Sequence, residues 1–183
     1  MELKIKIMTP DLSFPVSLMV GDKVFVYTKF NILSPKTWLS ALVRVFGHLR
    51  RNHCKVVGKK DGILKFVEAV EGGVEFNPII YNPKKERILV RRNIIPVDEE
   101  LYNARLLSIE GKGYDYENLL WDQLLWNNFH IWIGAKTEEE AEKKFICYEV
   151  GFFVDKDNLD YPWWECHPDV YLNAFWMDTI YEE

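Results

Sequence analysis

Three residues of this chain are of the types that together perform nucleophilic catalysis: Cys147, His53 and Glu68. Cys147 lies in the apolar stretch Phe145-Ile146-Cys147-Tyr148-Glu149-Val150, whereas the other two lie far upstream. A cysteine becomes an effective nucleophile when a base takes its proton, and a third group holds the base in the required tautomer and orientation. We therefore consider a cysteine hydrolase in which Glu68 orients His53 and His53 activates Cys147. The competing interpretation is that all three are ordinary core or surface residues.

A hairpin between residues 53 and 68 would bring the base and the carboxylate together. Residues 54–57 and 63–67 are β-type runs, and they flank Lys59-Lys60-Asp61-Gly62, which ends in an Asp-Gly turn pair. Two such runs around a short turn predict a pair of antiparallel strands. We expect residues 59–62 to form the loop.

The register of this hairpin decides which residues face each other. With a loop over residues 59–62, Gly58 pairs with Ile63, and His53 lies opposite Glu68. Slipping the register by two residues gives His53 the partner Val70 but keeps Glu68 on the same face, because side-chain direction has a period of two. Cross-strand geometry then places the Cβ atoms of His53 and Glu68 about 5 to 7 Å apart.

The position of Cys147 within its helix decides whether a thiolate is stabilised. Thr137-Glu138-Glu139-Glu140 is a capping box, and from there a helical pattern could continue through Cys147 to Val154. Free amides and the positive end of the helix dipole stabilise a thiolate at a helix N-terminus, and this benefit is lost ten residues further on. We therefore predict that the capped segment is a short turn ending around residues 143–145. Cys147 would then lie in the first turn of a separate, buried helix.

The remaining patterns predict an α+β protein, because strand patterns gather in the first half and helix patterns in the second. The further expected strands cover residues 2–7, 23–27 and 86–91. Three helices are expected. The first begins at Ser34-Pro35 and runs to about Arg50, the second begins at Asp98 and carries Leu101, Ala104 and Leu107, and the third begins at Asp115. Residues 173–177 fit either a last edge strand or a short helix.

Composition limits the class of protein. The 183 residues are 48% hydrophobic and 15% aromatic, which predicts a single domain over residues 1–183. A net charge of −5 argues against general binding to nucleic acid, which needs a basic surface. We find neither a secretory signal nor a run of membrane-spanning length, and three cysteines do not form a disulfide framework. We therefore expect a cytoplasmic protein with free thiols, and leave its oligomeric state open.

Five short motifs follow one another in a specific order: Gly21-Asp22 before a strand, Asn52-His53 at the start of a strand, Val67-Glu68-Ala69 in the next strand, Gly113-Tyr114-Asp115, and the stretch around Cys147. From about residue 20 onward they resemble the circularly permuted branch of the NlpC-type papain-like cysteine peptidases, often called YiiX-like. In that branch the histidine precedes the cysteine. The resemblance implies a permuted papain-like α+β fold in which an antiparallel sheet packs against helices.

The resemblance also implies an activity, namely cleavage of an amide bond through an acyl-enzyme, in a peptide such as one derived from the cell wall. By this likeness Cys147 is the nucleophile, His53 the general base and Glu68 the orienting residue, and no metal or cofactor is required. The substrate would be a small peptide, amide or acyl compound. The alternatives are a thioesterase, lipid acyl hydrolase or acyltransferase of the same fold, or a binding or structural protein without turnover.

Two positions depart from the pattern of this branch. Tyr148 follows the cysteine where a serine is usual, which can alter the pocket or the oxyanion donors. Cys54 follows the histidine where an apolar residue is usual. Because neighbouring residues of a strand point to opposite faces, Cys54 is expected to be a core thiol on the far side of His53.

A rival site would be a tetrahedral zinc, for which His53-Cys54 and Cys166-His167 supply two histidines and two cysteines. Opposite side-chain directions in the first pair argue against both of its members binding one ion. Trp163-Trp164 could stack on a sugar or contact a partner, but the packing of an aromatic loop over the core is the simpler interpretation. Arg50-Arg51 could receive an acidic substrate, and here a solvated helix end is favoured.

Overall fold

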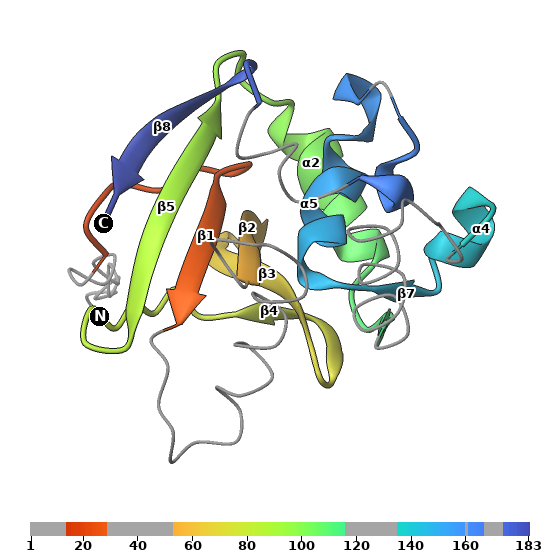
Figure 1. Ribbon diagram of the computed structural model, residues 1–183, viewed down its shortest axis with the longest axis horizontal. Helices are drawn as coiled ribbons and strands as arrows, with labels where there is room; N and C mark the ends of the chain where they lie inside the picture. The colour runs from red at the N-terminus through yellow and green to blue at the C-terminus, as the bar shows by residue number, and fades with distance from the viewer. Residues whose placement is uncertain (1–13, 29–52, 116–134, 160, 167–173) are drawn as a thin grey trace, which may run out of the picture.

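The computed structural model describes residues 14–28, 53–115, 135–159, 161–166 and 174–183. Its largest element is a six-stranded antiparallel sheet in the order β4-β3-β2-β1-β5-β8, which lies beside helices α2 and α5 (Figure 1). The strands are β1 Lys23–Thr28, β2 His53–Lys60, β3 Ile63–Val70, β4 Gly73–Asn77, β5 Glu86–Asn93 and β8 Met177–Glu182. The α+β fold class expected from the sequence is confirmed.

The helices among the described residues are short and follow β5 in the chain. They are α2 Glu99–Ser108, α4 Glu138–Ala141 and α5 Cys147–Val154, followed by the 3-10 turns η2 Lys156–Asn158 and η3 Trp163–Glu165. A second, parallel pair of two-residue strands, β6 Gly113–Tyr114 and β7 Lys144–Phe145, lies between α2 and α5 in the chain. No helix in the described part of the chain is long and apolar enough to cross a membrane.

The sheet separates two apolar clusters, because alternate side chains of each strand point to opposite faces. Val56 belongs to the larger cluster, between the sheet and the helices, whereas its neighbour Val57 belongs to the smaller cluster on the other face. The larger cluster includes Phe25, Cys54, Val56, Val67, Leu106, Cys147 and Phe152, and the smaller includes Val24, Val57, Phe66, Tyr81 and Val90. Burial of each large apolar side chain contributes about 1.5 to 3 kcal/mol.

The hairpin between β2 and β3 forms as expected, but with a shorter loop. Lys60 pairs with Ile63, so the loop is only Asp61-Gly62, and both loop residues have positive φ, 54° and 76°. Asp-Gly adopts this turn readily, which allows the strands to extend through the two lysines before it. The predicted loop over residues 59–62 is therefore wrong, and Gly58 pairs with Lys65, a register slip of two residues.

The sequence patterns gave the start of α2 correctly but not its buried face. Asp98 caps the helix by accepting hydrogen bonds from the backbone N–H groups of Glu100 and Leu101. Leu101 is nevertheless 48% exposed, and the helix buries Tyr102 and Leu106 instead. The Tyr102 hydroxyl explains this choice of face, because it is hydrogen-bonded to the buried Lys23 and Asp155 side chains.

Strand β4 was not predicted from the sequence. The turn before it is Glu71-Gly72, and Gly73 is already the first residue of β4, paired with Val70. Gly73 has a φ of 114°, and a Cβ atom at this position would lie 2.4 Å from the carbonyl oxygen of Lys112. The next residue, Val74, donates its backbone N–H to that same carbonyl at 2.9 Å. Glycine is therefore required where the backbone passes this close to the Lys112 carbonyl.

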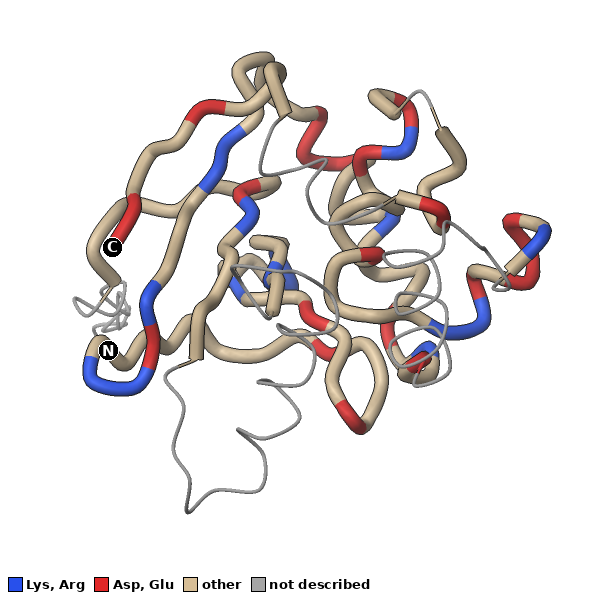
Figure 2. The backbone as a smooth tube through the Cα atoms, in the orientation of Figure 1, with Lys and Arg blue, Asp and Glu red and all other residues tan. Residues whose placement is uncertain are grey.

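Several expected elements lie outside the described residues, namely the strand over residues 2–7, the helix over residues 34–50 and the helix after Asp115. The segment over residues 173–177 leads into an edge strand, since β8 begins at Met177 and pairs with β5. Figure 2 shows that lysine and arginine are interspersed with aspartate and glutamate along the described chain.

Candidate active site

The start of β2 and the middle of β3 bring His53 and Glu68 together. The His53 Nε2 atom lies 2.5 Å from the Glu68 Oε2 atom. The side chains are 22% and 9% exposed, so the pair is largely shielded from water. The predicted contact is present despite the slipped register, because a shift of two residues leaves both side chains on the same face of the sheet.

Glu68 has two further partners. The Lys55 Nζ atom lies 3.6 Å from Oε2, the oxygen that also faces His53, and Asn77 donates its side-chain N–H to Oε1 at 3.3 Å. Burial raises the pKa of Glu68, but the hydrogen bond and charge of His53, together with Lys55 and Asn77, lower it to about 2. The carboxylate is therefore ionised throughout the physiological pH range.

The helix that could have continued to Cys147 ends before it, as predicted, and a separate helix begins at Cys147. Helix α4 ends at Ala141, β7 occupies Lys144–Phe145, and α5 begins at Cys147. Ile146 is extended, with φ −95° and ψ 166°, and its backbone N–H donates to the Glu149 Oε2 atom at 2.8 Å. An acidic side chain three residues into the helix thus satisfies an amide at its start, as in a capping box.

Helix α5 is buried along its whole length and packs on β2 and β3. Cys147 is 3% exposed. The Tyr148 ring lies in the core with its centroid 6.3 Å from that of Phe25. Tyr148 therefore helps to fix the first turn of α5 against the sheet.

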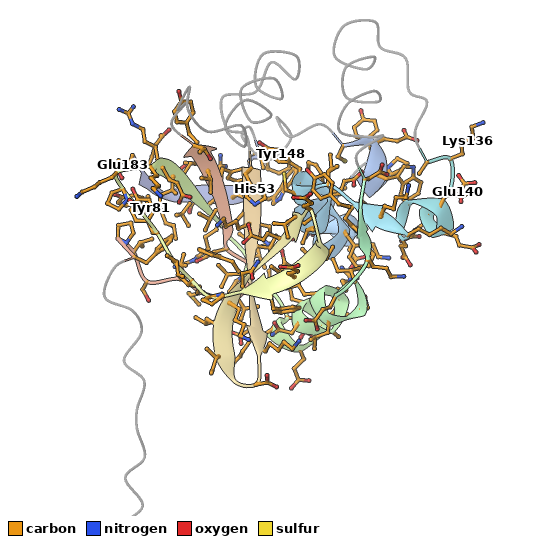
Figure 3. The ribbon with its side chains drawn as sticks, turned by 90° about the horizontal axis from the view of Figure 1, so that it is seen from below. His53, Tyr81, Lys136, Glu140, Tyr148 and Glu183 are labelled. Atoms are coloured by element: carbon orange, nitrogen blue, oxygen red, sulfur yellow. The ribbon has the colours of Figure 1, made fainter. Side chains whose placement is uncertain are left out.

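His53 interacts with Cys147 as well as with Glu68. Burial lowers the pKa of His53, but the charge of Cys147 and a side-chain hydrogen bond to it, together with Glu68, raise the pKa to about 9. Because Nε2 faces Glu68, Nδ1 is the ring nitrogen that remains for Cys147. Figure 3 labels His53, at the start of β2, and Tyr148, in the first turn of α5, and these two elements pack on each other. The base therefore contacts the carboxylate, and its pKa responds to the charges of both Glu68 and Cys147.

The other two cysteines lie in different surroundings. Burial raises the pKa of Cys54 well above its usual value, with a further contribution from the charge of Cys147. Burial, assisted by Glu165, raises the pKa of Cys166 to about 12. Both thiols are therefore protonated at neutral pH. Cys54 belongs to the larger apolar cluster, between the sheet and the helices. Phe66, which lies two residues before Glu68 on β3, belongs to the smaller cluster on the other face of the sheet.

Comparison with known proteins gives a fold. No family model and no curated protein matches this sequence. The crystal structure of the metalloprotein YiiX from Escherichia coli O157:H7 matches with a TM-score of 0.59 over 90% of this chain and 97% of that chain, at 16% sequence identity. The chain has the fold of YiiX. The resemblance drawn from the five short motifs is thereby confirmed at the level of the fold.

Two residues on this YiiX-like scaffold were missed by the sequence reasoning. Lys55 could have been found, since it lies two positions after His53 and so shares its face of β2. Asn77 could not, because it ends β4, a strand that the sequence patterns did not predict. The His53 and Glu68 contact had a signal in the Asp-Gly hairpin.

The aromatic loop near the C-terminus packs on the core, as the simpler interpretation expected. The Trp163 ring stacks on Phe145 with centroids 5.3 Å apart and an angle of 7° between the planes. Phe153 meets the same indole edge-on, also at 5.3 Å. This packing covers the segment that leads into α5.

Proposed function

We propose that this protein is a thiol hydrolase that forms an acyl-enzyme on Cys147, with His53 as base and acid and Glu68 as the residue that positions His53. One arrangement carries the proposal, namely an imidazole that contacts a carboxylate through Nε2 and whose pKa is raised by a cysteine at a helix start. The YiiX fold of the chain is compatible with it, because YiiX-like proteins resemble papain in fold. The preferred substrate is the amide bond of a small peptide, such as one derived from the cell wall.

In the first half of the reaction the Cys147 thiolate attacks the carbonyl carbon, and a carbon–sulfur bond forms while the carbonyl oxygen takes up the negative charge. The first amides of a helix have no intrahelical acceptor, so the backbone N–H of Cys147 is suited to donate to this oxygen. Protonated His53 then gives its proton to the leaving nitrogen, and the carbon–nitrogen bond breaks.

In the second half, neutral His53 takes a proton from water, and the resulting hydroxide adds to the acyl carbon. The carbon–sulfur bond breaks, the thiolate leaves, and the acid product is released. Glu68 stays ionised throughout, because its pKa is held at about 2. Its negative charge favours the imidazolium in both halves.

The same steps serve thioesters and lipid esters, so these belong in a first panel of substrates. An acyltransferase would differ only in the acceptor that replaces water. We place the reaction in the cytoplasm, because the three cysteines are free and reducing compartments keep thiols in that state.

A metal is a separate question, because the YiiX structure is described as that of a metalloprotein. Among the residues that the structure describes, no group of three or more His, Cys, Asp and Glu side chains could hold a metal ion. His53 is directed to Glu68, and the Cys54 thiol is buried in the core, so the rival zinc set is not assembled by its described members. His167 lies outside the described residues. The mechanism therefore contains no step through a metal.

Alkylation at pH 6 tests the proposal, since an ordinary thiol is almost wholly protonated there. Iodoacetamide labelling mapped by mass spectrometry should modify Cys147 selectively, and His53→Ala should remove this selectivity. Cys54→Ala and Cys166→Ala are the matched controls and should leave the labelling of Cys147 unchanged. Labelling of Cys147 no faster than that of Cys54 or Cys166 would support a binding or structural protein.

Acyl-enzyme formation gives a second readout that does not depend on an alkylating agent. With p-nitrophenyl acetate as the probe, intact mass spectrometry should detect one acetyl group on the wild-type protein, located at Cys147. Cys147→Ser, which keeps the size of the side chain, should reduce this acylation sharply. Acetylation that persists at another residue would assign the reactivity elsewhere.

A further inference from the structure

Lys55 shares an oxygen of Glu68 with His53. The His53 Nε2 atom lies 2.5 Å from Oε2, and the Lys55 Nζ atom lies 3.6 Å from the same atom. The Lys55 side chain is only 16% exposed, and its Nζ atom lies 5.1 Å from the centroid of the Phe66 ring. A lysine so enclosed is held in place next to the pair and is not a freely moving surface cation.

We infer that Lys55 is a positioning residue that shares the Glu68 carboxylate with His53 and so weakens the hold of Glu68 on the imidazolium. The inference rests on the proposed function, in which His53 must both accept and release a proton. Its physical basis is the geometry of one carboxylate oxygen that faces two cations on the same strand, β2.

The charges around His53 explain why such a residue is useful. Among the described residues, Glu68 on β3 and Cys147 on α5 both favour the imidazolium. Glu75 on β4 is the sheet partner of Glu68 and is exposed. Lys55 is a positive charge on the same face as His53, and it opposes the imidazolium. General acid catalysis is most efficient when the pKa of the acid lies near the operating pH, so this opposition assists the release of the proton.

Lys55 has a second consequence for the carboxylate itself. When His53 has given up the proton on Nδ1, its Nε2–H and the Asn77 side chain still face Glu68, but both are neutral and the largely buried carboxylate has lost the charge of the imidazolium. The Lys55 charge continues to compensate the carboxylate in that state, which lowers the cost of the neutral imidazole form. Glu68 therefore stays in place to receive His53 when it is protonated again.

Histidine-selective ¹⁵N NMR provides the test, because it measures the protonation of His53 directly and does not require turnover. The chain has four histidines, and His53→Gln identifies the signal of His53. Lys55→Met keeps a long unbranched side chain at this position but removes the charge over the Phe66 ring. We expect it to raise the pKa of His53 by about 0.5 to 1.5 units. Lys55→Arg, which keeps the charge, should restore a value close to that of the wild type.

The matched control is Lys60→Met. Lys60 lies at the other end of β2 and pairs with Glu110 at 2.5 Å, so its removal should leave the pKa of His53 unchanged. Circular dichroism confirms that each variant is folded. A pKa of His53 that is the same in Lys55→Met and Lys60→Met, or that falls in Lys55→Met, overturns the inference.

The NMR test of Lys55 and the alkylation test of the proposed function can fail independently of each other. Repeating the titration in Cys147→Ser removes the thiolate, and the effect of Lys55→Met on the pKa of His53 should persist. If Cys147 proves unreactive but the shift is present, the proposed function fails and the Lys55 interaction stands. If Cys147 is selectively alkylated and the shift is absent, only the Lys55 inference fails.

Discussion

At the scale of single residues, Glu68 holds His53 in place. Its two carboxylate oxygens contact His53, Lys55 and Asn77. Glu68→Gln keeps the shape but removes the charge that favours the imidazolium. We expect the rate of Cys147 alkylation at pH 6 to fall about tenfold or more while the fold survives. Glu71→Gln, at an exposed glutamate in the next turn, is the control. An unchanged rate in Glu68→Gln would mean that another residue orients His53.

The same variant should leave a pH signature in stability. The pKa of His53 is raised from 6.5 to about 9, so its contribution is fully present below about pH 6.5 and is lost as the pH rises through 9. The pKa of Glu68 is lowered from 4.5 to about 2, so its contribution is present above about pH 4.5 and is lost as the pH falls toward 2. Urea unfolding should therefore show the largest deficit of Glu68→Gln between about pH 4.5 and 6.5. A deficit that is constant with pH would contradict the ion pair.

At the scale of elements, the start of α5 is the feature that makes Cys147 available. β7 requires extended backbone to pair with β6, and the chain can turn into a helix only after Ile146. Glu149 stabilises this start by accepting the Ile146 N–H at 2.8 Å. The cysteine is thus held at the first position of its helix by a cap three residues further on.

Removal of the cap tests this arrangement. Glu149→Ala should lower the free energy of unfolding by about 1 to 2 kcal/mol and slow the alkylation of Cys147, because the first turn frays. Glu149→Gln retains an acceptor and should recover much of both effects. Urea unfolding and mapped iodoacetamide labelling measure the two quantities. If Glu149→Ala loses stability but labels Cys147 at the wild-type rate, the cap does not position the thiol.

At the scale of the whole molecule, the sequence-based predictions that were confirmed depend on geometry that neither a register slip nor contacts with other segments can change. The period of two in β2 and β3 kept Glu68 beside His53 even though the loop is two residues long. The break before Cys147 followed from the chemical requirement for a helix start. The buried face of α2 failed because Tyr102 is directed by partners from other segments, and no local pattern encodes those partners.

Those partners form a buried polar cluster that joins β1 to the far end of α5. The Lys23 Nζ atom lies 2.6 Å from the Asp155 Oδ2 atom, and both side chains are 0% exposed. The Tyr102 hydroxyl accepts from Lys23 at 2.5 Å and donates to Asp155 Oδ1 at 2.9 Å. Asp155 directly follows α5, so this cluster fixes one end of the helix whose other end carries Cys147.

Breaking this pair should therefore affect the whole fold. Asp155→Asn leaves the Lys23 ammonium buried without its anion, and we expect a loss of about 3 to 5 kcal/mol in the free energy of unfolding. The double variant Lys23→Met with Asp155→Leu removes both charges and should recover most of that loss, because an apolar pair of similar volume avoids the desolvation of two ions. Urea unfolding of Lys23→Met, Asp155→Leu and the double variant measures the coupling. Losses that simply add in the double variant would show that the two residues stabilise the fold independently.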